Sequence, residues 1–218
     1  MIGFAYCHGW SFDAGSLAPL RAELARRFPH AAQAVFDLGF TCAPQSPQLA
    51  PDVAWIALGH SYGFAWLMQL PQPWRAAISI NGFTRFCRHA GHREGAPVRR
   101  IEAMLAKIPQ DAQAVVSDFQ AHCGAQTATQ TAAQVQYDQA ALAGHLVQVR
   151  DLDLSLPACP TLALATSDDI VVPQALTQAC FAQSHCTLRE FSGDHLRLLR
   201  EPAAAADAIV AFLESIDA

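Results

Sequence analysis

The chain has 218 residues, 52% of them hydrophobic, and a formal net charge of -5. Such a chain can bury a sizeable core, and its negative charge gives no electrostatic support to a general nucleic-acid-binding role. No apolar run approaches the roughly 18 residues that cross a bilayer, no signal-peptide pattern opens the chain and the seven cysteines form no C-x-x-C pair, so we expect a cytoplasmic protein with reduced thiols.

Short apolar runs alternate with helix-like segments along most of the chain. In chain order the sequence predicts a strand over 1–6, a helix over 16–28, strands over 34–40 and 53–58, a helix over 62–70 and a strand over 76–80. After an interruption come a strand over 161–165, a helix over 173–182, a strand over 187–191 and a final helix over 201–215. Strands that are apolar throughout and alternate with helices are typical of a parallel sheet covered on both faces. The sequence therefore predicts an α/β fold with about six mostly parallel strands.

The interruption between the fourth and fifth strands spans residues 84–150. It is rich in Gln, Ala, His and Arg, and it contains helical patterns over 98–108, 112–121 and 132–142. A segment of this length with such patterns favours a helical insertion over a disordered linker. We expect a core formed by 1–83 and 151–218, with 84–150 as a helical lid.

Ser61 stands in the pentapeptide Gly59-His60-Ser61-Tyr62-Gly63, between an expected strand and an expected helix. The G-x-S-x-G pattern has a chemical meaning in that setting, because the tight strand-to-helix turn exposes the serine hydroxyl at the end of the sheet. A serine that happens to lie between glycines in a loop is the alternative interpretation. The strand and helix patterns on either side favour the nucleophile.

A nucleophilic serine needs a base, and an acid that orients the base, and in this architecture they follow in the order serine, acid, histidine. The loop after the fifth strand contains Asp168 and Asp169, and the loop after the sixth contains His195. Both loops lie at the carboxyl ends of strands, where open α/β sheets form their ligand sites. The pattern indicates Ser61 and His195, with either Asp168 or Asp169 as the acid.

With these motifs the whole chain resembles an α/β-hydrolase. In that family the acid commonly stands four residues before a proline, which favours Asp169, four before Pro173. The family's oxyanion loop follows an early strand as H-G-x, matched here by His8-Gly9-Trp10. The resemblance implies an oxyanion hole formed by the backbone N–H groups of Trp10 and Tyr62, whose side chains would also line the substrate site. It requires neither a metal nor an organic cofactor.

The first part of the expected lid is basic. Between positions 85 and 107 six basic residues are opposed by Glu94 and Glu102 alone, namely Arg85, Arg88, Arg93, Arg99, Arg100 and Lys107. A solvated helical surface is one interpretation. A docking face for an anionic partner or substrate is the other.

Within the family, the chain resembles the pimeloyl-acyl-carrier-protein methyl ester esterases of biotin synthesis. The likeness rests on H-G-W at 8–10, D-L-G-F at 37–40, A-I-S-I-N-G-F at 77–83 and F-Q-A-H-C-G at 119–124. It implies that the basic lid receives an acidic acyl carrier protein while the acyl chain passes Phe119 to reach Ser61.

Three other functions remain open at this point. The same triad could serve a general short-chain carboxylesterase or thioesterase, or a hydrolase of carbon–carbon bonds. A non-catalytic α/β-hydrolase scaffold is the third, although such proteins typically lose a member of the triad and this sequence retains all three.

Overall fold

The computed structural model describes residues 1–125, 135–156 and 158–217. Its centre is one sheet with the strand order β2-β1-β3-β4-β5-β6, in which every neighbouring pair is parallel. The strands are β1 (Ile2–Cys7), β2 (Ala32–Phe36), β3 (Ala54–His60), β4 (Ala76–Ile80), β5 (Thr161–Thr166) and β6 (Cys186–Phe191). The expected parallel α/β sheet is confirmed.

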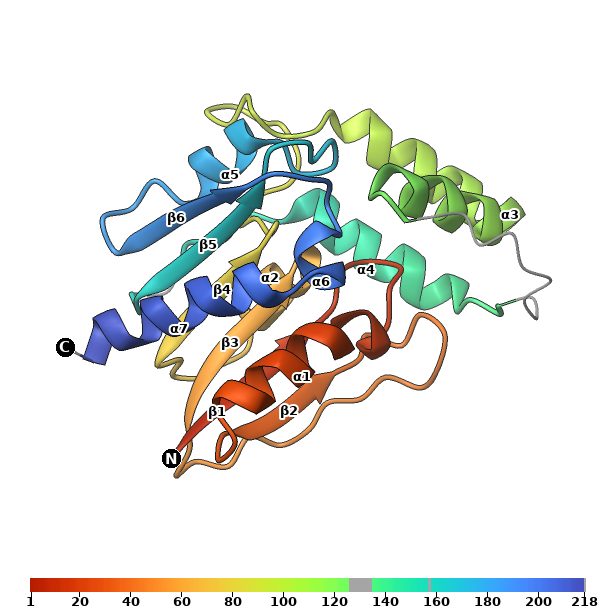
Figure 1. Ribbon diagram of the computed structural model, residues 1–218. Coiled ribbons are helices and arrows are strands. Elements are labelled where there is room, and N and C mark those ends of the chain that lie inside the picture. The colour runs from red at the N-terminus through yellow and green to blue at the C-terminus, as the bar shows by residue number, and fades with distance from the viewer. Residues whose placement is uncertain (126–134, 157, 218) are drawn as a thin grey trace.

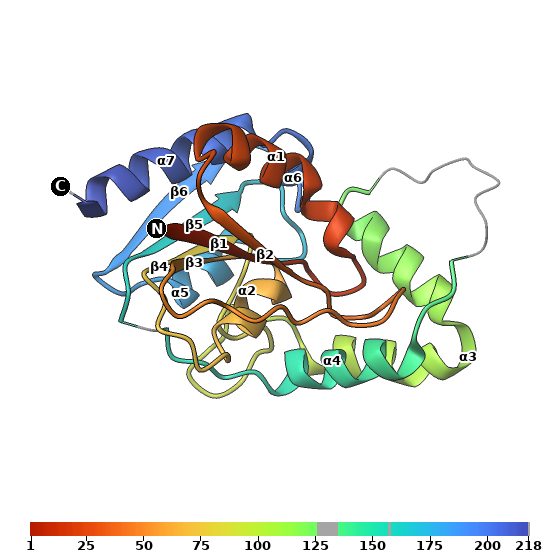
Figure 2. The ribbon, with the colours of Figure 1, turned by 90° about the horizontal axis from the view of Figure 1, so that it is seen from below.

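Helices cover both faces of this sheet (Figures 1 and 2). One face carries α1 (Ala18–Arg27), which follows the short 3-10 helix η1 (Ala14–Leu17), together with α6 (Arg197–Arg200) and α7 (Ala203–Asp217). The other face carries α2 (Tyr62–Leu67) and α5 (Gln174–Cys180). None of the helices within the described ranges is long and apolar enough to cross a membrane.

Burial explains why the strand sequences lack polar alternation. Every residue of the central strands β4 and β5 is buried, because helices pack on both faces. The edge strand β6, with the sequence CTLREF, has no buried residue, which accounts for its charged positions.

The order of the strands creates a switch point at one edge of the sheet, at the carboxyl ends of β1 and β3. From β1 the chain passes to β2 on one side, and then returns to place β3 on the other side of β1. Loops that leave β1 and β3 at their carboxyl ends therefore diverge, and ligands bind at such a switch point. Figures 1 and 2 show α3 (Val98–His122) and α4 (Gln139–Asp151) beyond this same edge.

The second strand differs from the expected 34–40, since it begins earlier and ends at Phe36. Asp37 ends it, because its carboxylate accepts hydrogen bonds from the backbone N–H groups of Ala14 and Gly39. Gly39 has a φ of 81°, a left-handed conformation that turns the chain away from the sheet.

Two of the three helical patterns in the insertion join into one kinked helix. The patterns at 98–108 and 112–121 both lie in α3, which contains Pro109 and departs from helical geometry at Asp111, with φ -156° and ψ 79°. Residues 84–97 before it form a loop with two isolated β-bridges, so the insertion is not helical from its start.

The helix expected over 132–142 has the wrong bounds. Residues 132–134 lie outside the described residues, and 135–138 are not helical. The helix α4 begins after Asp138, whose side chain caps it by accepting a hydrogen bond from the Ala141 N–H. It then continues to Asp151, beyond the expected end.

Candidate active site

Ser61 lies on a strained turn between β3 and α2. Its φ of 54° and ψ of -127° are unusual for a residue with a side chain. The turn is possible because both glycines of the motif are approached closely by backbone: a Cβ on Gly59 would overlap the backbone of Phe64, and one on Gly63 would overlap the carbonyl oxygens of Cys7 and His8. The structure therefore explains the spacing of the motif sterically.

Asp169 is the carboxylate that faces His195. His195 Nδ1 lies 2.6 Å from Asp169 Oδ2, and both side chains are fully buried. The other oxygen, Oδ1, accepts hydrogen bonds of 2.8 Å from the backbone N–H groups of Val171 and Val172. The neighbouring Asp168 is exposed, so of the two candidates only Asp169 is in a position to orient the imidazole.

The backbone of His195 is held from two sides. Its carbonyl oxygen accepts hydrogen bonds from Asn81 Nδ2 at 3.0 Å and from His60 Nε2 at 3.1 Å. Asn81 also donates to the Thr166 hydroxyl and accepts from the Thr166 N–H, which ties the histidine loop to the ends of β4 and β5. The sequence motifs indicate no catalytic role for Asn81 or His60.

The imidazole of His195 has one nitrogen available for proton transfer. Nδ1 donates to Asp169, and the buried Nε2 has no hydrogen-bond partner among the described residues. The ring centroid of His195 lies 4.7 Å from that of His60, the residue before Ser61 in the chain. Burial and the nearby His195 hold the pKa of His60 well below its usual value, so His60 stays neutral beside the base.

Trp10 and Tyr62 lie where the loop after β1 approaches the turn at Ser61. Trp10 follows β1, and a Cβ built on the preceding Gly9 would lie 3.1 Å from Ser61 Cβ. Tyr62 is the first residue of α2, so its N–H has no acceptor within the helix. Neither N–H donates to another group within the described part of the chain, and both remain candidates for the oxyanion hole.

The side chains of these two residues are fastened to α4. The indole Nε1 of Trp10 donates to the Leu142 carbonyl oxygen at 2.9 Å. The Tyr62 hydroxyl donates to Gln148 Oε1 at 2.6 Å and lies 3.0 Å from His145 Nδ1. The helix α4 thus braces both residues of the candidate oxyanion hole, a feature with no signal in the sequence because the partners lie more than eighty residues apart.

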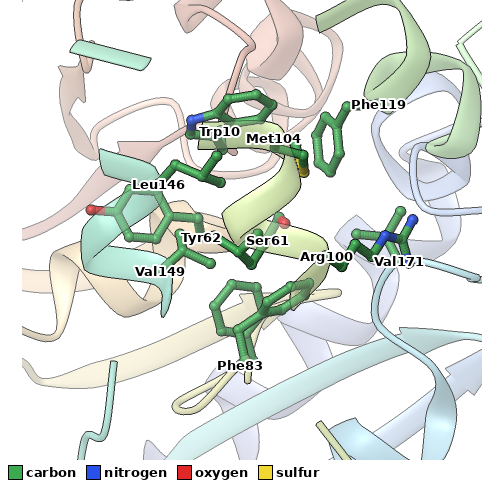
Figure 3. Close-up of a pocket in the computed structure, with 12 residues that line it drawn as sticks. Trp10, Ser61, Tyr62, Phe83, Arg100, Met104, Phe119, Leu146, Val149 and Val171 are labelled. Carbon is green, nitrogen blue, oxygen red and sulfur yellow. The ribbon is translucent and has the colours of Figure 1, made fainter. Parts of the chain in front are cut away.

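A pocket opens above Ser61 (Figure 3). The space between the lining atoms, together with adjoining space open to solvent, is about 420 Å³. The residues lining it come from α3, α4, the start of α2 and the loops beside the sheet: Trp10, Ser61, Tyr62, Phe83, Phe86, Arg100, Ile101, Met104, Phe119, Leu146, Val149 and Val171. Phe119 packs edge-on against Trp10, with ring centroids 5.0 Å apart. The three expected substrate-site residues, Trp10, Tyr62 and Phe119, therefore share one mostly apolar pocket.

The six basic residues at the start of the insertion have different surroundings. Arg85 pairs with Asp153, and Lys107 pairs with Asp118. Arg88, Arg93 and Arg99 are exposed, and Arg100 lines the pocket. Among the described residues, no three His, Cys, Asp or Glu side chains are grouped as metal ligands would be.

No protein-family model and no curated protein sequence matches the chain. Solved structures do match it along nearly its whole length. An esterase from Exiguobacterium antarcticum has a TM-score of 0.73 at 13% identity, over 98% of this chain and 92% of that one. A bromoperoxidase from Bacillus anthracis has a TM-score of 0.78 at 14% identity, and an enol-lactonase from Burkholderia xenovorans 0.74 at 13%, each over 98% of this chain and 92% of its own. These likenesses identify the fold of the chain as the α/β-hydrolase fold.

Proposed function

We propose that the protein is a serine hydrolase that cleaves carboxylic esters through an acyl-enzyme. One observation carries the proposal: beside the strained turn at Ser61, the loops after β5 and β6 bring together Asp169 and His195, and the second imidazole nitrogen has no hydrogen-bond partner among the described residues. An imidazole oriented by a carboxylate, with its other nitrogen unbonded, is the base that a nucleophilic serine needs, which supports this proposal. The fold alone would not carry it, because the same fold hosts many chemistries.

In the proposed mechanism, His195 Nε2 takes the proton of the Ser61 hydroxyl as its oxygen attacks the ester carbonyl. Asp169 holds the imidazole in the tautomer that leaves Nε2 free, and it stabilises the charged imidazolium. The backbone N–H groups of Trp10 and Tyr62 donate to the oxyanion, and each such donor typically contributes about 3 kcal/mol to transition-state stabilisation. His195 then protonates the leaving alcohol, and a water molecule repeats the sequence to release the acid and restore Ser61.

A finer proposal names the substrate as the methyl ester of a pimeloyl chain presented by acyl carrier protein, in biotin synthesis. Its support is the sequence resemblance, the basic start of the insertion and the mostly apolar pocket that would accept an acyl chain. Arg88, Arg93 and Arg99 are exposed and available to an acidic partner. Hydrolysis of short free esters or thioesters by the same triad is the alternative.

Labelling with a fluorophosphonate probe tests the chemistry. We expect Ser61 to react and the Ser61→Ala variant to remain unlabelled and inactive on p-nitrophenyl esters. A correctly folded wild type that neither reacts nor turns over would favour the non-catalytic scaffold.

Complementation tests the finer proposal. The wild-type gene should rescue growth without biotin in a strain that lacks its methyl esterase, and Ser61→Ala should not. Esterase activity without rescue would favour the general esterase.

A further inference from the structure

One charged side chain faces the otherwise neutral pocket above Ser61. Of the twelve residues that line this pocket, Arg100 alone carries a formal charge. The others present aromatic rings, aliphatic groups or the Ser61 hydroxyl, and the hydroxyl of Tyr62 is already bonded to α4. A permanent positive charge at such a surface is therefore a feature that a substrate would meet.

Arg100 has no ion-pair partner among the described residues. The residues outside that range, 126–134, 157 and 218, include no Asp or Glu. Arg85 and Lys107 differ from Arg100, because each has a carboxylate partner. The other basic residues of this segment, Arg88, Arg93 and Arg99, do not line the pocket above Ser61. The guanidinium of Arg100, with its planar set of N–H donors, is thus free to bind a carboxylate from outside the chain.

Arg100 lies at the mouth of the pocket above Ser61. Besides the pocket above Ser61, Arg100 lines a second hollow on the lid, and Met104 and Phe119 line both. Arg100 is also exposed to solvent. In Figure 3 it lies on one side of Ser61, with Leu146 and Val149 on the other. An extended molecule whose ester group is at Ser61 could reach Arg100 with its far end while its middle contacts apolar side chains.

We propose that Arg100 binds an anionic group at the far end of the acyl chain, so that half-esters of dicarboxylic acids are preferred substrates. The inference rests on the proposed serine hydrolase chemistry but not on a carrier protein. Two parallel N–H groups of Arg100 would donate to the free carboxylate, and Met104 and Phe119 would contact the methylene chain. An acyl chain bound to a carrier protein would instead put a neutral thioester in this region, with no carboxylate for Arg100 to bind.

Two chain-matched esters test the inference. Monomethyl pimelate carries the free carboxylate, and methyl heptanoate has the same chain length without it. For the wild type we expect kcat/KM to be about tenfold higher for monomethyl pimelate, mainly through a lower KM, as one charge-assisted hydrogen-bonded pair at an exposed site can supply. Arg100→Gln should remove the preference, and Arg100→Lys should retain part of it.

Arg189→Gln is the matched control. Arg189 is exposed on β6 and does not line the pocket, so its loss lowers the net charge equally and should leave the preference unchanged. Equal kcat/KM for the two esters in the wild type would overturn the inference, as would a preference that survives in Arg100→Gln. A carrier-bound methyl ester that is hydrolysed well while the free half-ester shows no preference would assign the specificity to lid docking instead.

Binding of pimelate to the Ser61→Ala variant, measured by calorimetry, separates this inference from the proposed function. Pimelate binding that weakens about tenfold with an added Arg100→Gln substitution would support the anion site even if the wild type turned over no ester. No binding of pimelate to Ser61→Ala would overturn the anion site, even if Ser61-dependent hydrolysis of neutral esters is observed.

Discussion

Replacement of Asp169 by asparagine should nearly abolish turnover, because the surroundings of the carboxylate dictate how the new amide must lie. Oδ1 accepts from two backbone N–H groups at 2.8 Å, and Oδ2 faces His195 Nδ1 at 2.6 Å. The two backbone N–H groups need an acceptor, which the amide oxygen of asparagine can be and its NH₂ group cannot. The NH₂ group must therefore point at His195 Nδ1. Nδ1 then has to act as an acceptor, the imidazole proton moves to Nε2, and Nε2 can no longer take the Ser61 proton.

The same reversal of tautomer in the chymotrypsin-type triad lowers kcat by about 10⁴, or roughly 5.4 kcal/mol at 1.36 kcal/mol for each factor of ten. We expect a loss of this order for Asp169→Asn in steady-state hydrolysis of p-nitrophenyl butyrate, with a parallel loss in the rate of fluorophosphonate labelling. Asp168→Asn is the control, because Asp168 is adjacent and exposed, and it should behave like the wild type. A loss below tenfold in a folded Asp169→Asn variant, or an equal loss in Asp168→Asn, would refute the reasoning about the acid.

Three further outcomes follow from the geometry. Gly63→Ala should sharply lower the melting temperature or the yield of folded protein, because the new methyl group would overlap two carbonyl oxygens. Gly144→Ala in α4 is the control: its methyl group would have no described atom within 4 Å, so the same thermal scan should show an unchanged or higher melting temperature. Tyr62→Phe should cost about 0.5–1.5 kcal/mol in urea unfolding, since it removes the hydrogen bond to Gln148, whose exposed amide can then bind water. An unchanged kcat would argue against the bracing of the oxyanion hole by α4. Stability should fall as the pH drops below about 6.5, because the unfolded chain then binds a proton that the depressed pKa of His60 keeps off the native state. His60→Gln, which retains a donor for the His195 carbonyl, should remove about 1 kcal/mol of that fall between pH 6.5 and 5.5.

Local patterns were sufficient for the order and type of most elements in the core. The run Ala76–Ile80 reads as a strand because all five residues are buried between two helical layers, and such burial leaves a continuous apolar run in the sequence. Boundaries were less well predicted where side chains end an element. Asp37 ends β2 by accepting hydrogen bonds from the Ala14 and Gly39 N–H groups, and Asp138 caps α4 by accepting one from Ala141. Short polar residues of this kind occur in many loops without capping anything.

The sequence by itself determined the α/β sheet and singled out Ser61, His195 and an aspartate pair as the candidate triad, because motif spacing and strand order are properties of the chain alone. From the sequence, the choice of Asp169 over Asp168 rests on a family resemblance alone. The structure adds a contact, because Asp169 Oδ2 lies 2.6 Å from His195 Nδ1. The tertiary structure alone brought Asn81 and His60 to the carbonyl of His195 and tied Trp10 and Tyr62 to α4. It also placed Arg100 at the pocket with no ion-pair partner among the described residues. These features depend on contacts between residues far apart in the chain, and such contacts leave no periodic or local pattern from which they could be predicted.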